Sequence, residues 1–390
     1  LVLLLYSCGH KDNDIIQTIK VNIAERQEIK ASELYEYISY LPLETNNEAI
    51  ISGDYPIKVE ENYIVVMDID HSLQRVFYIF DRDGNYVNKI SRPTEGREKI
   101  VGAFDFLVDN ENLEVLDKIQ GKVLIFDINS GVLTKKIDLY TGLQYFQKVN
   151  NAYLLSGRYG PVDTSGNEVF LFSDGIIEPF AYETPEHIKE LPMQFTPFSP
   201  INFEDNHLYY QFFSSNLYKV SEKGIDLYFQ IDFGSIMPEV DYMNSIVRDP
   251  AARLKLFNNP EYTSGIHLAL EAENKLIIVF PHNRVNYYLL YDKKSGQKQI
   301  FYFDRKKSND INFGILPTLP RGVTKNGEFV FIMQPYDIMN FLKSQENGLS
   351  STEYNQRYPN TSDFVQIVNN LKDVDNPVLI FAKLREDKFY

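Results

Sequence analysis

The sequence is poor in cysteine and in basic residues, and it contains no long hydrophobic run. Cys8 is its only cysteine, so no intrachain disulfide can form and no cysteine-based zinc site can be built. Lys and Arg number 39 against 54 Asp and Glu, a net charge of −15, which argues against a nucleic-acid partner, because such a partner requires clustered positive charge. No run of about 18 apolar residues occurs, so no helix of the mature chain is expected to span a membrane.

Motifs for catalysis and for cofactor binding are also missing. The sequence has no GxGxxG, Walker A or GxSxG element, and its 6 histidines form no HExxH pair. We therefore predict no cofactor and no metal site, and we favour a protein without catalytic activity. Paired carboxylates that cleave glycosidic bonds are defined by their separation in space, so the sequence leaves an enzymatic role open.

The first ten residues, LVLLLYSCGH, resemble the end of a bacterial lipoprotein signal sequence. An apolar run leads into LYSCG, which is similar to a lipobox, where a lipid is attached to the cysteine and the chain is cut just before it. The resemblance implies that residues 1–7 are a signal remnant, that Cys8 carries the lipid, and that residues 8–33 form a tether. The following KDND resembles the export signal of surface-exposed lipoproteins. The alternative is a buried strand with an incidental cysteine.

One hairpin pattern recurs along the chain. In VFYIFDRDGNYVNKI (residues 76–90) an aromatic strand leads through a glycine-containing turn to a second strand. The turn glycines of the successive copies are Gly84, Gly131, Gly175, Gly224 and Gly296. Their intervals are 47, 44, 49 and 72 residues, the last being long because residues 233–261 insert a helical segment. A period of about 40–50 residues is typical of the blades of a β-propeller.

Each copy is completed to four antiparallel strands. Before each aromatic strand a turn with Asn or Gly leads into an apolar run, as in ENYIVVMD (61–68), and these residues suit the left-handed backbone of tight hairpins. Strands such as VFYIF are apolar on both faces, as blades packed between two neighbours require. We therefore predict an all-β fold over residues 34–390, a six-bladed β-propeller of four-stranded antiparallel blades.

The sixth copy has no outer strand of its own near the end of the chain. LYEYISYLPLE (34–44) can fill this position and join the beginning of the chain to the last blade. Such closure removes an exposed sheet edge. Two helical insertions are predicted to interrupt the ring, at about 233–261 and 335–376.

The chain resembles the six-bladed β-propeller lipoproteins of Gram-negative bacteria, whose blades are NHL-like. The resemblance rests on the lipobox and on YLPLET (40–45), FDRDGNYVNKI (80–90), FDFLVDNENLEVLD (104–117) and DNPVLIFAKL (375–384). It implies the propeller fold and a location at the cell surface or in the periplasm. Members often carry a loop ending in Gly-Glu-Tyr after the first blade, and SRPTEGREKIVGAF (91–104) lacks that ending. The role of that loop therefore does not carry over.

The lengths of the connections differ between the two faces of the predicted propeller. Turns between the first and second and between the third and fourth strands of a blade share one face, and here all of them are tight. The long connections, which include 91–102, 183–196, 233–261 and 335–376, belong to the opposite face. Long connections often carry function. We therefore predict a binding site on this long-loop face, around the central channel.

Four pairs of residues at the starts of connections on this face are candidates for ligand binding. The pairs are Asp70 and His71, Arg158 and Tyr159, His282 and Arg284, and Gln334 and Tyr336. Arginine suits a carboxylate or a sulfate, and tyrosine suits the face of a sugar or a peptide. The alternative for each residue is a solvated charge or a local turn bond.

The features together predict a lipoprotein, anchored to the membrane only by its lipid, that recognises an oligosaccharide or a peptide outside the cytoplasm of a Gram-negative bacterium. One alternative is a hydrolase or lyase that acts on glycans, because a fold does not decide function. A second alternative is a scaffold that docks another envelope protein through its helical insertions.

Overall fold

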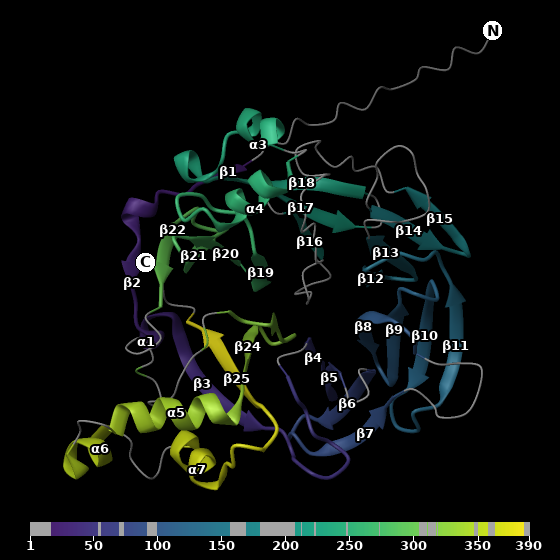
Figure 1. Cartoon of the computed structure of the whole chain (residues 1–390), viewed down its shortest axis with the longest axis vertical. Coiled ribbons are helices and arrows are strands. Elements are labelled where there is room, and N and C mark those ends of the chain that lie inside the picture. The colour runs from purple at the N-terminus through teal and green to yellow at the C-terminus, as the bar shows by residue number, and fades with distance from the viewer. Residues whose placement is uncertain are drawn as a thin grey trace.

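The protein forms a ring of six small β-sheets (Figure 1). The computed structural model describes residues 17–53, 56–69, 74–91, 100–156, 169–179, 207–211, 213–221, 224–246, 249–272, 274–303, 310, 317, 319–346, 350–357 and 363–385. The prediction of an all-β, six-bladed propeller is confirmed. The sheets are numbered here as blades 1 to 6 in chain order.

Blades 1 to 3 are built from consecutive strands. Blade 1 holds β4 (Ile57–Val59), β5 (Tyr63–Ile69), β6 (Arg75–Asp81) and β7 (Tyr86–Ile90). Blade 2 holds β8 (Ala103–Asp109), β9 (Asn112–Asp117), β10 (Lys122–Asp127) and β11 (Leu133–Asp138). Blade 3 holds β12 (Tyr145–Val149), β13 (Ala152–Ser156), β14 (Val169–Ser173) and β15 (Ile176–Pro179). In each of these blades the first strand lies nearest the centre of the ring and the last lies at its rim (Figure 1).

Blades 4 to 6 also take in strands from the beginning of the chain. Blade 4 holds β16 (His207–Tyr210), β17 (Asn216–Ser221), β18 (Gly224–Asp232) and, outside them, β1 (Gln17–Lys20). Blade 5 holds β19 (Leu268–Ala272), β20 (Lys275–His282), β21 (Val285–Asp292), β22 (Lys298–Tyr302) and, outside them, β2 (Gln27–Glu28). Blade 6 holds β23 (Gly322–Val323), β24 (Glu328–Met333), β25 (Val378–Leu384) and β3 (Tyr35–Pro42).

The N-terminal strand β3 closes the ring, as predicted for residues 34–44. It runs antiparallel to β25, with Leu41 opposite Leu379. Its Tyr35 is almost fully buried, within the cluster that packs blade 6 against blade 5. The closure joins residues that are far apart in the sequence, and β3 supplies the outer strand of blade 6.

Strand β6 shows why a blade strand is apolar on both faces. Val76, Tyr78 and Phe80 pack in the cluster shared with blade 6. Phe77 and Ile79 point the other way, into the cluster shared with blade 2. Because successive side chains of a strand alternate between its faces, a sheet sandwiched between two others needs apolar residues at every position.

The turn at Gly84 joins blade 1 to the closing strand. Gly84 has a φ of +82°, and a β-carbon at this position would lie 2.6 Å from the carbonyl oxygen of Pro42. Only glycine meets both conditions without strain. The carbonyl of Gly84 also accepts a hydrogen bond of 2.8 Å from the backbone N–H of Glu44, just after β3.

The segment expected to be a tether, residues 8–33, belongs to the propeller from residue 17 onward, so the prediction is wrong for residues 17–33. Strands β1 and β2 pair in parallel with the outer strands of blades 4 and 5, and η1 (Ile23–Glu25) lies between them. The reason is the short apolar pattern of this segment, because Ile19 and Val21 are buried against blades 4 and 5. The short helix α1 (Ala31–Leu34) then leads into β3.

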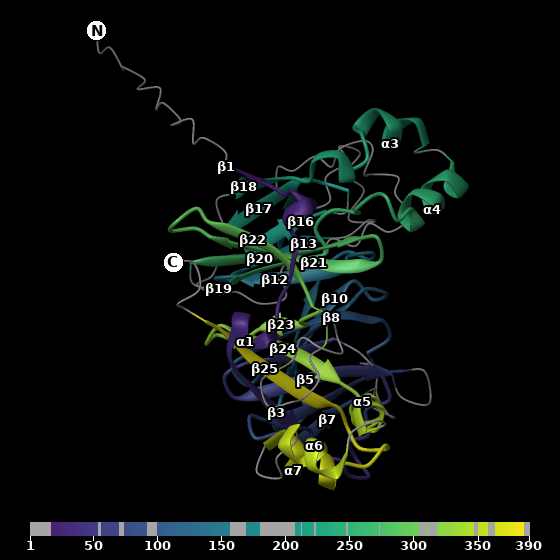
Figure 2. The same ribbon diagram turned by 90° about the vertical axis from the view of Figure 1, so that its left-hand side faces the viewer.

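Both predicted insertions are helical. The first contains η2 (Gly234–Ile236), α3 (Val240–Ile246) and α4 (Pro250–Asn258), and α3 and α4 project from one face of the ring (Figure 2). The second contains α5 (Pro335–Glu346), α6 (Ser351–Arg357) and α7 (Asp363–Asn370).

The helices of the two insertions bury only part of their apolar side chains. Met243 is buried, but Val240 is 50% exposed. Phe364 of α7 is buried, with its ring 4.8 Å from that of Tyr40 on β3. Within the described residues, no helix has the length and apolar character needed to cross a lipid bilayer.

Candidate functional site

Half of the residues predicted to bind a ligand cannot be placed. Asp70, His71, Arg158 and Tyr159 lie outside the described residues, as does the predicted lipidation site Cys8. The ligand-binding and lipid-anchoring roles of these five residues therefore stay predictions.

His282 and Arg284, which the sequence placed at the start of a connection on the long-loop face, lie in a tight hairpin. Strands β20 and β21 continue to either side of Asn283 and Arg284, whose φ angles are 49° and 62°. Two successive left-handed residues make a type I′ turn, which matches the twist of the flanking strands. Burial and the nearby charge of Arg26 lower the pKa of His282.

Gln334 and Tyr336 lie at the start of α5. The side-chain amide of Gln334 donates a hydrogen bond of 3.0 Å to the carbonyl of Gly53, and the backbone carbonyl of Gln334 accepts a hydrogen bond from the N–H of Asp337. Tyr336 is 62% exposed on the helix surface. Among the four described candidates, no hydrogen bond or ion pair joins one to another, so the described residues do not form the convergent site that was predicted.

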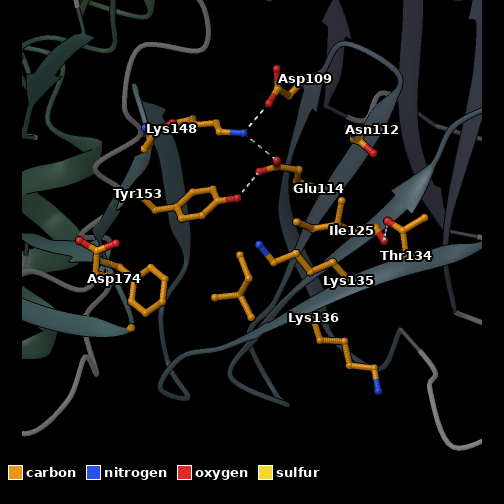
Figure 3. Close-up of a pocket in the computed structure, with 14 residues that line it drawn as sticks. Asp109, Asn112, Glu114, Ile125, Thr134, Lys135, Lys136, Lys148, Tyr153 and Asp174 are labelled. Atoms are coloured by element: carbon orange, nitrogen blue, oxygen red, sulfur yellow. Dashed lines mark hydrogen bonds and ion pairs between the residues drawn. The ribbon is translucent and has the colours of Figure 1, made fainter.

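A concave site among the described residues lies elsewhere, in a groove between blades 2 and 3 (Figure 3). It has a volume of about 670 Å³. Its lining residues are Asp109, Asn112, Glu114, Ile125, Thr134, Lys135, Lys136, Ile137, Lys148, Asn151, Tyr153, Phe172, Asp174 and Gly175.

Three turns place the groove toward the short-turn face. Asp109 and Asn112 flank the β8–β9 turn, Asn151 lies in the β12–β13 turn, and Asp174 and Gly175 form the β14–β15 turn. All three turns join first to second or third to fourth strands of a blade. The groove therefore opens away from the long-loop face on which the sequence placed the site.

A buried carboxylate, Glu114 of β9, forms the back of the groove (Figure 3). Only 2% of Glu114 is exposed. Its Oε2 accepts a hydrogen bond of 2.8 Å from the Tyr153 hydroxyl, and its Oε1 lies 3.1 Å from Nζ of Lys148. Lys148 also pairs with Asp109. Because the two partners of Glu114 come from β13 and β12, this network crosses the boundary between blades 2 and 3.

The same network shifts the pKa values of Tyr153 and Lys148. Burial and the charge of Glu114 raise the pKa of Tyr153 far above its usual value. Partial burial acts to lower the pKa of Lys148, but the hydrogen bond to Asp109 and the charge of Glu114 outweigh it, and the net shift is upward. At neutral pH Lys148 is therefore a cation and Tyr153 is neutral, and neither exchanges a proton readily near pH 7.

A similar network joins blades 4 and 5. Glu271 of β19 accepts a hydrogen bond of 2.7 Å from the Tyr228 hydroxyl and pairs with Lys293. Here only the hydrogen bond of Tyr228 crosses the boundary, because Lys293 directly follows β21 in the same blade as Glu271. In the groove between blades 2 and 3, the set of Glu114, Tyr153 and Lys148 acts as a clamp between the two blades, because both carboxylate oxygens of Glu114 have partners.

Lys135 of β11 is a cation of the groove that takes no part in the clamp. Figure 3 shows its side chain extending toward Tyr153, whereas that of Lys136 extends the opposite way. Lys135 has no ionic or hydrogen-bonding partner among the residues that the structure describes. Beside it, Ile125, Ile137 and Phe172 supply apolar walls. The groove thus offers an unpaired cation next to apolar surface and fixed polar groups.

A second pocket, of about 520 Å³, lies between β3 and α7. Its lining residues are Tyr40, Pro42, Asp363, Gln366, Ile367, Asn370, Leu371 and Asp375. Its lining contains two carboxylates and no cation. Among the described residues no cluster of three or more side chains suited to hold a metal occurs.

Comparison with known proteins identifies the family of the chain. Residues 15–383 match the model of a family described as a domain of unknown function, DUF4934. The chain belongs to this family. No curated protein matches it.

A solved structure shows the same fold as this DUF4934 member. A crystal structure from Bacteroides fragilis, of a protein described as exported, has a TM-score of 0.72 and 18% identity and covers 95% of this chain and 99% of that one. A structural-genomics protein of unknown function from Bacteroides thetaiotaomicron has a TM-score of 0.44 and 8% identity, with 91% and 74% covered. At 18% identity, the first similarity shows a shared fold and says nothing about function. The second similarity is too low to support a conclusion about the fold.

The groove of this DUF4934 member left only a weak signal in the sequence. Glu114 interrupts the apolar run of NLEVLD, and Lys148 is the last residue but one of the inner strand YFQKV. A charged residue inside a strand that is otherwise buried needs a partner. The sequence does not say which blade supplies that partner, because the partners lie 34 and 39 residues further along the chain.

Proposed function

We propose that the protein is a non-catalytic recognition module of the cell envelope, which binds a polar ligand with an acidic group in the groove between blades 2 and 3. The observation that carries the proposal is the unpaired ammonium of Lys135 in a groove of about 670 Å³. A carboxylate or sulfate on a sugar or a peptide would pair with it, and Asn112 and Asn151 would add hydrogen bonds.

The protonation of the groove supports binding more than catalysis. General acid–base catalysis needs a group whose pKa lies near the working pH. The pKa values of Tyr153 and Lys148 are both shifted upward, away from neutrality. A glycan-cleaving enzyme stays the alternative, and release of reducing ends from an oligosaccharide in a Lys135-dependent manner would favour it.

A thermal-shift screen against acidic and neutral oligosaccharides and peptides tests the proposal, because a ligand raises the melting temperature by mass action. We expect acidic compounds to raise it for the wild type and for Lys122→Ala, and not for Lys135→Ala. Lys122 is a matched control, since it lies in the same blade and outside the groove. A shift lost in Tyr336→Ala and kept in Lys135→Ala would move the site to the long-loop face.

We also propose that Cys8 carries a lipid that anchors the protein, as in the NHL-like propeller lipoproteins that the sequence resembles. The lipobox supports this proposal, and so does the fold shared with a protein described as exported. Cys8→Ala is expected to move the protein from the membrane fraction to the soluble fraction of the envelope. An unchanged membrane fraction would contradict the anchor.

A further inference from the structure

The lining of the groove between blades 2 and 3 carries charges of both signs and no net charge. Three carboxylates and three ammonium groups line it, those of Asp109, Glu114, Asp174, Lys135, Lys136 and Lys148. Lys148 pairs with both Asp109 and Glu114, so these three side chains are occupied with one another. A ligand that carries both charges matches such a lining better than an acid alone, because a second negative charge would meet the carboxylates.

Asp174 is an unpaired carboxylate at the edge of the groove. Its side chain is exposed and, in the part of the chain that the structure describes, forms neither an ion pair nor a hydrogen bond. Asp174 and Gly175 have φ angles of 52° and 80° and make a type I′ turn, which the pairing of Ser173 with Ile176 closes. The backbone that carries this carboxylate is therefore held by the hairpin of β14 and β15.

Lys135 and Asp174 stand on opposite walls of the groove. Lys135 belongs to β11 of blade 2, and Asp174 belongs to the β14–β15 turn of blade 3. Figure 3 shows the two side chains on either side of Tyr153. No ion pair joins them, so each charge is free to meet a ligand. Ile137 and Phe172 line the same groove with apolar surface.

From this arrangement we propose that the groove binds a short peptide with two free ends, its carboxylate on Lys135 and its ammonium on Asp174. Both ends of such a peptide are charged near pH 7. The side-chain amides of Asn112 and Asn151 each offer a donor and an acceptor, as the N–H and C=O groups of a peptide require. The apolar lining would hold an aliphatic side chain. The inference rests on the proposed function and adds the class of ligand.

Four versions of one tripeptide, made of alanine, valine and alanine, test the inference. The first has free ends, the second an acetylated N-terminus, the third an amidated C-terminus, and the fourth both. Their binding to the full chain is measured by isothermal titration calorimetry. We expect the peptide with free ends to bind most tightly, and each blocked end to weaken binding about two- to fivefold, as the loss of an exposed ion pair does. Equal binding of the four peptides overturns the inference.

Two variants assign each end of the peptide to a side chain. Asp174→Asn is expected to lose the preference for a free N-terminus and to keep the preference for a free C-terminus, and Lys135→Gln is expected to do the reverse. Glu178→Gln is the control, because Glu178 is exposed in the same blade as Asp174 and lies outside the groove. It should keep both preferences. If Asp174→Asn still prefers the free N-terminus, the inference is wrong.

The outcomes separate this inference from the proposed function. An acidic oligosaccharide that binds in a Lys135-dependent manner, while none of the tripeptides binds, overturns the inference and leaves the proposed function standing. If neither the oligosaccharide nor a tripeptide binds in a Lys135-dependent manner, both are overturned.

Discussion

The hydroxyl of Tyr153 in blade 3 donates a hydrogen bond of 2.8 Å to the carboxylate of Glu114 in blade 2. The two residues belong to the second strands of neighbouring blades, so the bond joins two sheets that share no backbone ladder. Glu114 is buried, and the loss of a partner would leave its charge poorly solvated. The stability of the ring and the shape of the groove therefore depend on the same contact.

Tyr153→Phe removes this hydrogen bond while it keeps the ring of the side chain. We expect the free energy of unfolding to fall by about 1–3 kcal/mol, because a buried charged acceptor loses its donor. Tyr140→Phe is the matched control, since Tyr140 is exposed, and it should change the free energy by less than about 0.5 kcal/mol. Urea unfolding followed by fluorescence measures both, and equal stabilities would show that the contact contributes nothing.

The closing strand makes a second prediction. Tyr35 and Tyr37 belong to the same strand, but Tyr35 is buried in the core and Tyr37 is exposed. Tyr35→Ala is expected to cost about 3–5 kcal/mol, as truncation of a large core side chain does, and Tyr37→Ala much less. Deletion of residues 34–44 should abolish the cooperative melting transition. A deletion variant that still melts cooperatively would contradict the closure.

The blade pattern could be predicted because it repeats. The turn glycines and the strands that are apolar on both faces recur along the chain, and each copy strengthens the reading of the others. The closing strand followed by elimination, because the last blade needed one more strand. Both predictions depend only on the local sequence pattern and on the number of strands that each blade requires.

The N-terminal strap, which is the segment of residues 17–20, and the groove could not be predicted in this way. QTIK (17–20) is short and mostly polar, and only the edge of β18 makes it a strand. Glu114, Lys135 and Tyr153 lie in three different strands, and their convergence depends on how blade 2 packs against blade 3. The turn at Asn283 and Arg284 was missed for another reason, because only Asn283 is of a type that favours the left-handed backbone, and an arginine rarely adopts it.

The N-terminal strap makes a third prediction. Ile19 is buried between blades 4 and 5, whereas Thr18 beside it is exposed. Ile19→Ala should lower the free energy of unfolding by about 2–4 kcal/mol, and Thr18→Ala should leave it within about 0.5 kcal/mol. Differential scanning calorimetry compares them. If Ile19→Ala melts like the wild type, residues 17–20 contribute nothing to the fold and act as the tether that the sequence suggested.

The buried histidine His267 predicts how stability depends on pH. Its Nε2 lies 2.6 Å from the hydroxyl of Ser264, and burial lowers its pKa from 6.5 to about 4. Between these two values the unfolded chain binds a proton that the folded chain excludes, so stability falls as the pH falls through this window. By about pH 4 the loss attributable to this histidine reaches about 3 kcal/mol.

His267→Gln isolates that contribution, because glutamine can keep a hydrogen bond to Ser264 but does not titrate. Urea unfolding at about pH 7.5 and about pH 4.5 should show a smaller loss of stability on acidification for the variant than for the wild type. The carboxylates of the chain are common to both proteins, so their contribution to the acid-dependent loss cancels in the difference. An identical loss in both proteins would mean that His267 is protonated in the folded state as readily as in the unfolded one.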